Sequence, residues 1–341
     1  MGRPTMKDVA RLAGVSVSTV SYALNETSTI ALADDTKARV RRAAREIGYV
    51  PNGVARSLRS QASRTVGMVL GKPLASPRYA AIAGGLASGL RERGFRLAVI
   101  DEPDAATAVD EVRGRLLDGL VFVGHDDQGV PDDLSRAVVE HHVPFVAVDC
   151  ASPADAAYAS VDFDYAVGVQ QALADIARRG VEHVLYVRPD IDSAAESMRA
   201  SAIVAAEQEH PGVRVHPFSS GLGPAALSRL DADRTAWPAR SRELAERIVE
   251  ALSGFGAASS AVLCAWGADA EPAYRAAREA GSHVRVTALA AGSLSEGLWP
   301  GLAYSRLPLE RAGRESARLV TSLSHDEPER ILLTPELTTH E

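Results

Sequence analysis

Five residues near the N-terminus have side chains and a spacing suited to contact with base edges. Residues 6–25 read MKDVARLAGVSVSTVSYALN, and the five are Val17, Ser18, Ser21, Tyr22 and Asn25. On a helix they form one smooth face of short or flat side chains, opposite Val20 and Leu24. A helix with such a face can enter a major groove and touch base edges. The alternative interpretation is an ordinary small helical hairpin.

The surrounding residues predict three short helices that position this face. Thr5 followed by Asp8 is a capping-box-like start, Gly14 suits a tight turn, and Ser16 can cap the second helix. A third helix is predicted over residues 34–47, with acids in its first turn and arginines toward its end, as the helix dipole favours. Three helices in under fifty residues predict a small helix-turn-helix domain over residues 1–50.

Charge divides the chain in two. Residues 1–64 hold eleven Lys and Arg against five Asp and Glu, a balance of +6, whereas the whole chain is −7, so residues 65–341 carry −13. This division, with residues 1–64 basic and residues 65–341 acidic, indicates that the basic part binds a polyanion.

Residues 51–64 predict a short hinge helix and a tether. Pro51 ends the preceding helix, Asn52 could cap a new one, and Arg56 and Arg59 suit phosphate contacts, with Leu58 as an apolar wedge. A helix of two turns is mostly unfolded alone in water. A plain interdomain linker is the alternative.

Residues 6–70 resemble the head and hinge of the lactose-repressor (LacI/GalR) family of bacterial transcription regulators. The matching segments, in order, are KDVARLAGVSVSTVSYALN, REIGYVPNGVARSLRS and TVGMVL. The resemblance implies a homodimer on a pseudo-palindromic operator in double-stranded DNA. It gives base contacts to Val17, Ser18 and Tyr22, and a minor-groove wedge to Leu58. It further implies phosphate or hinge contacts for Thr19, Ser21, Asn25, Asn52, Ala55, Arg56 and Arg59.

From Thr65 onward, short apolar runs alternate with helical patterns. Strands this apolar are covered on both faces, as in parallel α/β sheets. Two such sets predict two doubly wound parallel-sheet subdomains with a cleft at the strand ends. Residues 219–240, rich in Gly and Pro, suggest a long irregular connection.

Residues 65–341 resemble the effector-binding and dimerisation domain of the same family, which is similar to periplasmic binding proteins. The resemblance implies an N-subdomain over about 65–162 and 291–321 and a C-subdomain over about 163–290 and 322–341. The chain ends soon after Pro335-Glu-Leu337 without a heptad tail. We therefore expect a dimer rather than a tetramer.

The cleft differs from the family pattern. Where relatives place an Asn–Asp pair and a Gly-Phe-Asp-Asp run, this sequence has Trp266-Gly267 and Ala288-Leu289-Ala290-Ala291. The resemblance carries an effector-binding role to Ser76, Tyr79, Asp149, Arg199, Trp266 and Ala290. Core packing for Trp266, a surface salt bridge for Arg199 and a helix cap for Asp149 are the alternatives.

Several functions are excluded by what the sequence lacks. It shows no signal peptide, no run of about 18 apolar residues, no cysteine or histidine ligand spacing and no catalytic set, so we expect no enzyme, metal, cofactor or membrane contact. The prediction is a cytoplasmic repressor, at the nucleoid when bound to DNA, controlled by a small molecule that is most often a sugar in this family. An alternative is the solute-binding protein of a transporter, which residues 65–341 taken alone would permit. A regulator with a degenerate cleft, controlled by a partner protein or by nothing, also stays open.

Overall fold

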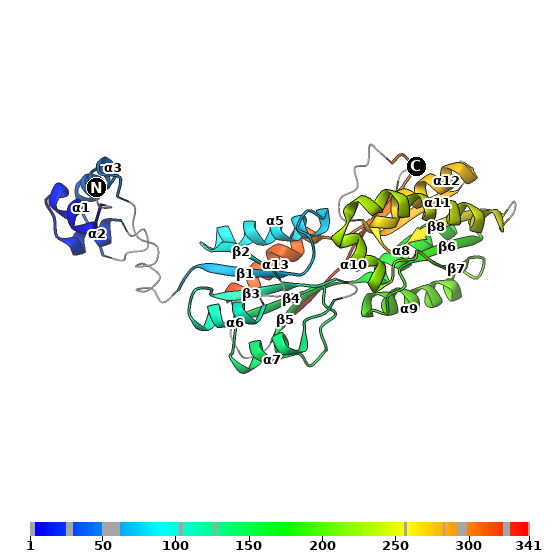
Figure 1. Cartoon of the computed structure of the whole chain (residues 1–341), viewed down its shortest axis with the longest axis horizontal. Coiled ribbons are helices and arrows are strands. Elements are labelled where there is room, and N and C mark those ends of the chain that lie inside the picture. The colour runs from blue at the N-terminus through cyan, green and yellow to red at the C-terminus, as the bar shows by residue number, and fades with distance from the viewer. Residues whose placement is uncertain are drawn as a thin grey trace. The chain divides into compact units, whose positions relative to one another are not determined.

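In the computed structural model, the chain forms two compact units, Met1–Ser63 and Arg64–Glu341, which we call the N-terminal unit and the body. The structure describes residues 4–24, 30–49, 62–101, 105–125, 128–255, 258–281, 284–291, 299–322 and 328–339. Each unit is described by itself (Figure 1).

The N-terminal unit contains the three helices that the sequence predicts: α1 (Met6–Ala13), α2 (Val17–Ala23) and α3 (Asp34–Glu46). The predicted capping box is confirmed, because the Thr5 hydroxyl oxygen accepts from the Asp8 backbone N–H at 3.4 Å and the Asp8 carboxylate accepts from the Thr5 N–H at 3.0 Å. Gly14 ends α1 with φ of 64°, a left-handed conformation that favours glycine. Ser16 caps α2 by accepting from the Thr19 N–H at 3.0 Å.

The first subdomain of the body is built on a parallel six-stranded sheet. Its order is β11-β5-β4-β3-β1-β2. The strands are β1 (Thr65–Leu70), β2 (Arg96–Asp101), β3 (Gly119–Val123), β4 (Phe145–Val148), β5 (Ala159–Phe163) and β11 (Arg330–Leu333). Helices α5 (Pro77–Glu92) and α13 (Leu309–Ser322) pack on one face, and α6 (Ala105–Arg113) and α7 (Asp132–Glu140) on the other.

The second subdomain repeats this plan with the order β12-β10-β9-β8-β6-β7, in which only β12 is antiparallel. Its strands are β6 (His183–Arg188), β7 (Arg214–Ser219), β8 (Ser260–Cys264), β9 (Arg285–Ala291), β10 (Ala303–Arg306) and β12 (Glu336–Thr338). Helices α8 (Tyr165–Arg178) and α9 (Ala194–Glu209) cover one face, and α11 (Trp237–Ser253) and α12 (Ala270–Ala280) the other. The predicted pair of doubly wound sheets is confirmed.

Two predicted crossings between the subdomains are wrong. The sequence placed them near 291 and 322, but β10 pairs with β9 in the second sheet and β11 pairs with β5 in the first. The crossings therefore lie between β10 and α13, and between β11 and β12. Tyr304 is buried with Ala270 and Ala288, which holds β10 in the second subdomain, whereas Leu307 and Leu309 belong to the first core.

Residues 219–240 also differ from the prediction of an irregular connection. They contain α10 (Pro224–Ala232), a 3-10 turn (Arg234–Ala236) and the start of α11. Pro224 stands in the first turn of α10, where its missing N–H costs no helical hydrogen bond. Leu222, Leu227 and Leu230 are buried in the second subdomain, so packing stabilises this short helix.

Helices α5 and α13 touch at the level of their backbones. A Cβ on Gly85 would lie 2.0 Å from the Glu310 carbonyl oxygen, and one on Gly313 would lie 2.2 Å from that of Ile82. Glycine is therefore required at both positions for this close approach. Gly85 of α5 and Gly313 of α13 therefore serve helix packing.

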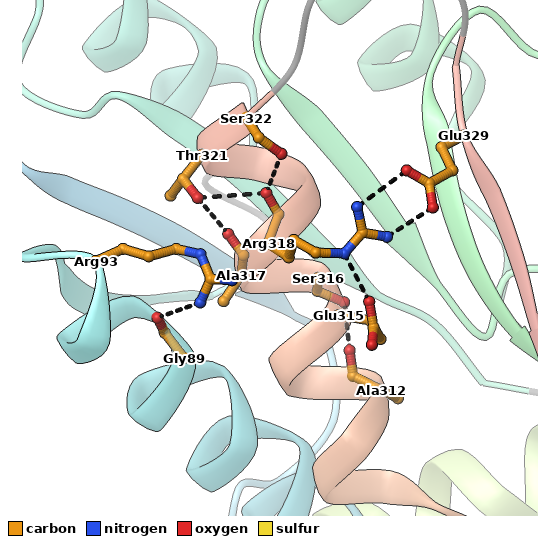
Figure 2. Close-up of polar contacts among 10 residues, drawn as sticks. All are labelled: Gly89, Arg93, Ala312, Glu315, Ser316, Ala317, Arg318, Thr321, Ser322 and Glu329. Atoms are coloured by element: carbon orange, nitrogen blue, oxygen red, sulfur yellow. Dashed lines mark hydrogen bonds and ion pairs between the residues drawn. The ribbon is translucent and has the colours of Figure 1, made fainter.

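Figure 2 shows the polar contacts around α13. Arg318 donates to both carboxylate oxygens of Glu329, at 3.0 and 2.6 Å, and to Glu315 at 2.8 Å. The hydrogen bonds from Arg318 lower the pKa of Glu329. The paired hydrogen bonds between Arg318 and Glu329 join α13 to the residues that precede β11. Among the described residues, no helix is long and apolar enough to cross a bilayer.

Candidate functional sites in the N-terminal unit and the body

In the N-terminal unit, α2 presents the face that the sequence singled out. Val17 and Tyr22 are 41% and 39% exposed, and Ser18 is exposed beside them, whereas Val20 and Ala23 are buried against α1 and α3. The buried positions fix the rotation of α2, so the three exposed side chains form its outer surface.

The other predicted DNA contacts divide into two groups. Thr19 and Ser21 are half-buried, and the Thr19 hydroxyl lies 2.8 Å from that of Ser16 within the cap. The remaining predictions lie outside the described residues; they are Asn25, Asn52, Ala55, Arg56, Leu58 and Arg59. Exposed Arg41, Arg42 and Arg45 stand in the second half of α3 and add positive charge to this unit.

In the body, a cavity of about 250 Å³ lies at the carboxyl ends of the first sheet's strands. It is lined by the turn after β3, by residues after β4, by the end of β5 and by the start of α9 in the second subdomain. The lining residues are His125, Gln128, Gly129, Asp149, Cys150, Ala151, Asp162, Phe163, Tyr165, Asp192, Ser193, Ala194, Ala195 and Met198. Its volume is just below the range of about 300–1,000 Å³ typical of drug-sized ligands, which suits a smaller ligand.

A buried ion pair forms one wall of this cavity. Arg78 of α5 donates to one oxygen of Asp149, and the Tyr165 hydroxyl donates to the other at 2.8 Å. Arg78 also donates to the Tyr165 hydroxyl oxygen at 3.1 Å. Because Tyr165 begins α8, these bonds connect the two subdomains. Asp149 has φ of 55°, and left-handed backbone of this kind in a non-glycine residue is often held in place at ligand sites.

Arg199 lies behind this wall rather than on the cavity surface. It is 1% exposed, and its guanidinium stands 4.4 Å from the centre of the Tyr165 ring. Its partner is Glu196 at 3.4 Å, which also contacts Arg188 at 3.1 Å and accepts from the Tyr186 hydroxyl at 3.0 Å. Burial raises the pKa of Glu196 and of Tyr186.

Asp162 forms a second part of the wall. One of its carboxylate oxygens accepts from the backbone N–H groups of Cys150 and Ala151, both at 3.1 Å. Burial raises the pKa of Asp162, and the negative charge of Asp149 adds to the effect. Burial, with the charges of Asp149 and Asp162, also raises the pKa of the Cys150 thiol.

An aromatic contact joins the subdomains at the cavity. The rings of His125 and Trp266 lie 4.8 Å apart, edge to face, and Tyr79 lies 6.3 Å from His125. Gly124 allows the turn after β3 to lie this close to β4, because a Cβ there would stand 2.7 Å from the Cys150 sulfur.

Of the six predicted effector residues, Asp149 lines the cavity. Tyr79 and Trp266 are buried beside His125, and Arg199 is buried behind Tyr165. Ser76 is half-buried before α5, and half-buried Ala290 packs against the first core. The roles of these six residues in effector binding stay predictions.

Sequence reasoning missed His125, Asp162 and Ser193. His125 follows β3, Asp162 lies near the end of β5, and Ser193 precedes α9. Their positions at the strand ends were the signal that could have identified them. Within the described residues, no three His, Cys, Asp or Glu side chains gather where a metal ion could bind.

Known proteins match this chain along its length. Residues 5–52 match the family described as bacterial regulatory proteins, lacI family. The HTH-type transcriptional regulator CelR of Thermobifida fusca is 28% identical, over 99% of this chain and 98% of its own. The ribose operon repressor of Escherichia coli (strain K12) is 33% identical over 43% of this chain and 44% of its own.

Solved structures show the same fold. A complex of transcriptional regulator CelR with cellobiose superposes with a TM-score of 0.60 at 25% identity, covering 99% of both chains. The Lac repressor dimer bound to operator and the anti-inducer ONPF gives a TM-score of 0.76 at 20% identity, covering 99% of this chain and 98% of that one.

The helix-turn-helix unit followed by two parallel-sheet subdomains defines a DNA-binding transcriptional regulator. Residues 5–52 form a lacI-family DNA-binding domain, and the whole chain is similar to HTH-type transcriptional regulators. Its relatives named above are regulators of transcription and not enzymes.

Proposed function

We propose that this protein is a repressor that binds a pseudo-palindromic operator as a homodimer and is controlled by a small hydroxylated molecule, sugar-like in class, in the cavity of the body. It acts in the cytoplasm, on the nucleoid when bound to DNA, and it performs no catalysis. The observation that carries this proposal is the outer face of α2, where Val17, Ser18 and Tyr22 are exposed on a helix whose rotation is fixed by its buried residues. Such a face suits base edges in a major groove.

Assembly as a homodimer is supported by the exposed edge of the first sheet. Strand β2 ends the order of that sheet, and its Val99 is 53% exposed while Leu97 and Ala98 are half-buried. An exposed apolar edge strand tends to associate with another chain unless something covers it. A related solved structure is described as a Lac repressor dimer bound to operator.

Control by a ligand is supported by the cavity between the subdomains. It is lined by residues of both, so a ligand that contacts both walls would favour one arrangement over another. CelR, the relative described above, has been solved as a complex with cellobiose. The alternative proposal is a regulator whose cleft has lost its ligand; burial of Arg199 and Trp266 in side-chain contacts favours it.

The test is selection of duplexes from a random pool by the full chain. We expect enrichment of a site with two half-sites related by two-fold symmetry. A single half-site would contradict the dimer, and no enrichment would contradict operator binding. Mass spectrometry of small molecules released from the purified protein then separates the two proposals, since the degenerate-cleft alternative predicts none.

A further inference from the structure

The cavity wall carries more negative charge than positive charge. Asp149, Asp162 and Asp192 line it, and no Lys or Arg stands among the described lining residues. Asp149 is paired with Arg78 of α5. For Asp162 and Asp192, the described part of the chain supplies no ion-pair partner.

Asp162 is the carboxylate that most needs a counter-charge. It is half-buried, and its partners are the backbone N–H groups of Cys150 and Ala151 and the Ser160 side chain rather than a cation. Each neutral donor stabilises a carboxylate less than an ionised partner does. Asp192, exposed at the mouth beside Ser193, adds a second charge of the same sign.

We propose that the cavity takes a hydroxylated ligand that carries a positively charged amine, an amino sugar or a hydroxylated amine, and that it rejects anions such as sugar acids and sugar phosphates. This inference rests on the proposed ligand site and names the chemistry of its occupant. The ammonium group would lie near Asp162 and Asp192. Hydroxyl groups would donate to the carboxylates and form hydrogen bonds with Gln128 and Ser193, and half-buried Met198 supplies an apolar surface for the ring.

The sign of the charge decides which ligands enter. In a site of low effective dielectric, one carboxylate several ångströms away changes the binding of a unit charge on the order of tenfold, in opposite directions for a cation and an anion. A neutral sugar gains nothing from this field. A preference for an amine-bearing ligand over a neutral sugar therefore distinguishes this cavity from one that binds neutral sugars.

Cys150 gives a test that does not depend on knowing the ligand. It lines the cavity, and the other cysteine, Cys264, is fully buried. Trimethylammonium-ethyl and sulfonato-ethyl methanethiosulfonate both convert a thiolate to a mixed disulfide and release methanesulfinate, so the reaction is the same and the charged head group differs. Rates are normalised to those of each reagent with free 2-mercaptoethanol, and Cys150→Ala confirms the labelled residue.

We expect the cationic reagent to label the full chain at least about tenfold faster than the anionic one. Asp162→Asn should reduce this ratio several-fold. Asp155→Asn, which removes the same charge at an exposed residue outside the cavity, should leave the ratio unchanged. The proposal would be overturned if the two reagents labelled at equal rates, if the anionic reagent were faster, or if no labelling occurred. It would also be overturned if both variants reduced the rate ratio equally.

Ligand class is tested by protection of Cys150 from a neutral methanethiosulfonate. D-glucosamine should protect at lower concentration than D-glucose, and D-gluconate should not protect. Protection by glucose or gluconate equal to that by glucosamine, or no protection by any of the three, would overturn the amine. Operator binding measured on the same samples separates the outcomes: a failed charge test with intact operator binding leaves the proposed function standing.

Discussion

Two neighbouring glycines in α5 should respond in opposite ways to the same substitution. Gly84 is exposed, and a Cβ built on it meets nothing within 4 Å. Gly85 is buried, and its Cβ would lie 2.0 Å from the Glu310 carbonyl oxygen of α13. Both positions are helical, so the gain in helix propensity on replacing Gly by Ala is shared and only the packing differs.

The magnitudes follow from these distances. Gly84→Ala should raise the free energy of unfolding by up to about 1 kcal/mol, the propensity difference between the two residues. Gly85→Ala requires α5 and α13 to separate by about 1 Å before the contact is tolerable, and overpacking of this kind costs about 1–3 kcal/mol or more. The two variants should therefore differ by the packing cost, about 1–3 kcal/mol or more, which corresponds to about 2–12 °C in Tm for a domain of this size.

Tryptophan fluorescence during urea unfolding of the full chain is a suitable assay. The three tryptophans, Trp237, Trp266 and Trp299, all belong to the body, so the signal reports that unit alone. Gly313→Ala, whose Cβ would lie 2.2 Å from the Ile82 carbonyl oxygen, should behave like Gly85→Ala. If Gly85→Ala were as stable as Gly84→Ala, the backbone contact between α5 and α13 would be refuted.

Three further outcomes are expected. Asp162→Asn should stabilise the body at pH 7, because the raised pKa of Asp162 means that the folded chain disfavours its charge; the gain should vanish below the ordinary carboxyl pKa of about 4, where both proteins are neutral at this position. Urea unfolding at pH 7 and pH 3.5 checks it, and a gain that persisted at pH 3.5 would point to another cause. Tyr165→Phe should destabilise the body by about 1–3 kcal/mol, since it removes the hydroxyl that contacts Asp149 and Arg78, and Tyr165→Leu should cost more because the ring beneath Arg199 is also lost. Equal losses for the two variants would show that the ring contributes nothing. Thr5→Ala should lower the stability of α1 by about 1 kcal/mol, seen as faster amide exchange in Met6–Ala13; unchanged exchange would mean that the capping box is dispensable.

Local signals were sufficient for the N-terminal unit. The capping residues Thr5 and Ser16, the turn at Gly14 and the buried Val20 are all set by neighbours within four residues, and the structure has them as predicted. The alternation of apolar runs and helical patterns likewise predicted two doubly wound sheets.

Long-range pairing explains what the sequence left unpredicted. β10 and β11 are both strands of four residues, and nothing in their own periodicity tells which sheet each one joins. The position of Arg199 has a similar cause. Its burial depends on Tyr165 at the start of α8 and on Glu196 of α9, and a spacing pattern does not reveal that arrangement.

The most direct test of the account compares affinities for the selected operator and for a scrambled duplex, measured by fluorescence anisotropy at one salt concentration. Ser18→Ala with Tyr22→Ala should lower the preference for operator by tenfold or more, since base contacts are worth about 1–3 kcal/mol each, while binding to scrambled DNA persists through charge. Arg41→Gln with Arg42→Gln, which removes exposed charge from α3, should leave the preference unchanged. If the α2 variant instead kept the full preference for operator, the claim that α2 reads the bases would be contradicted.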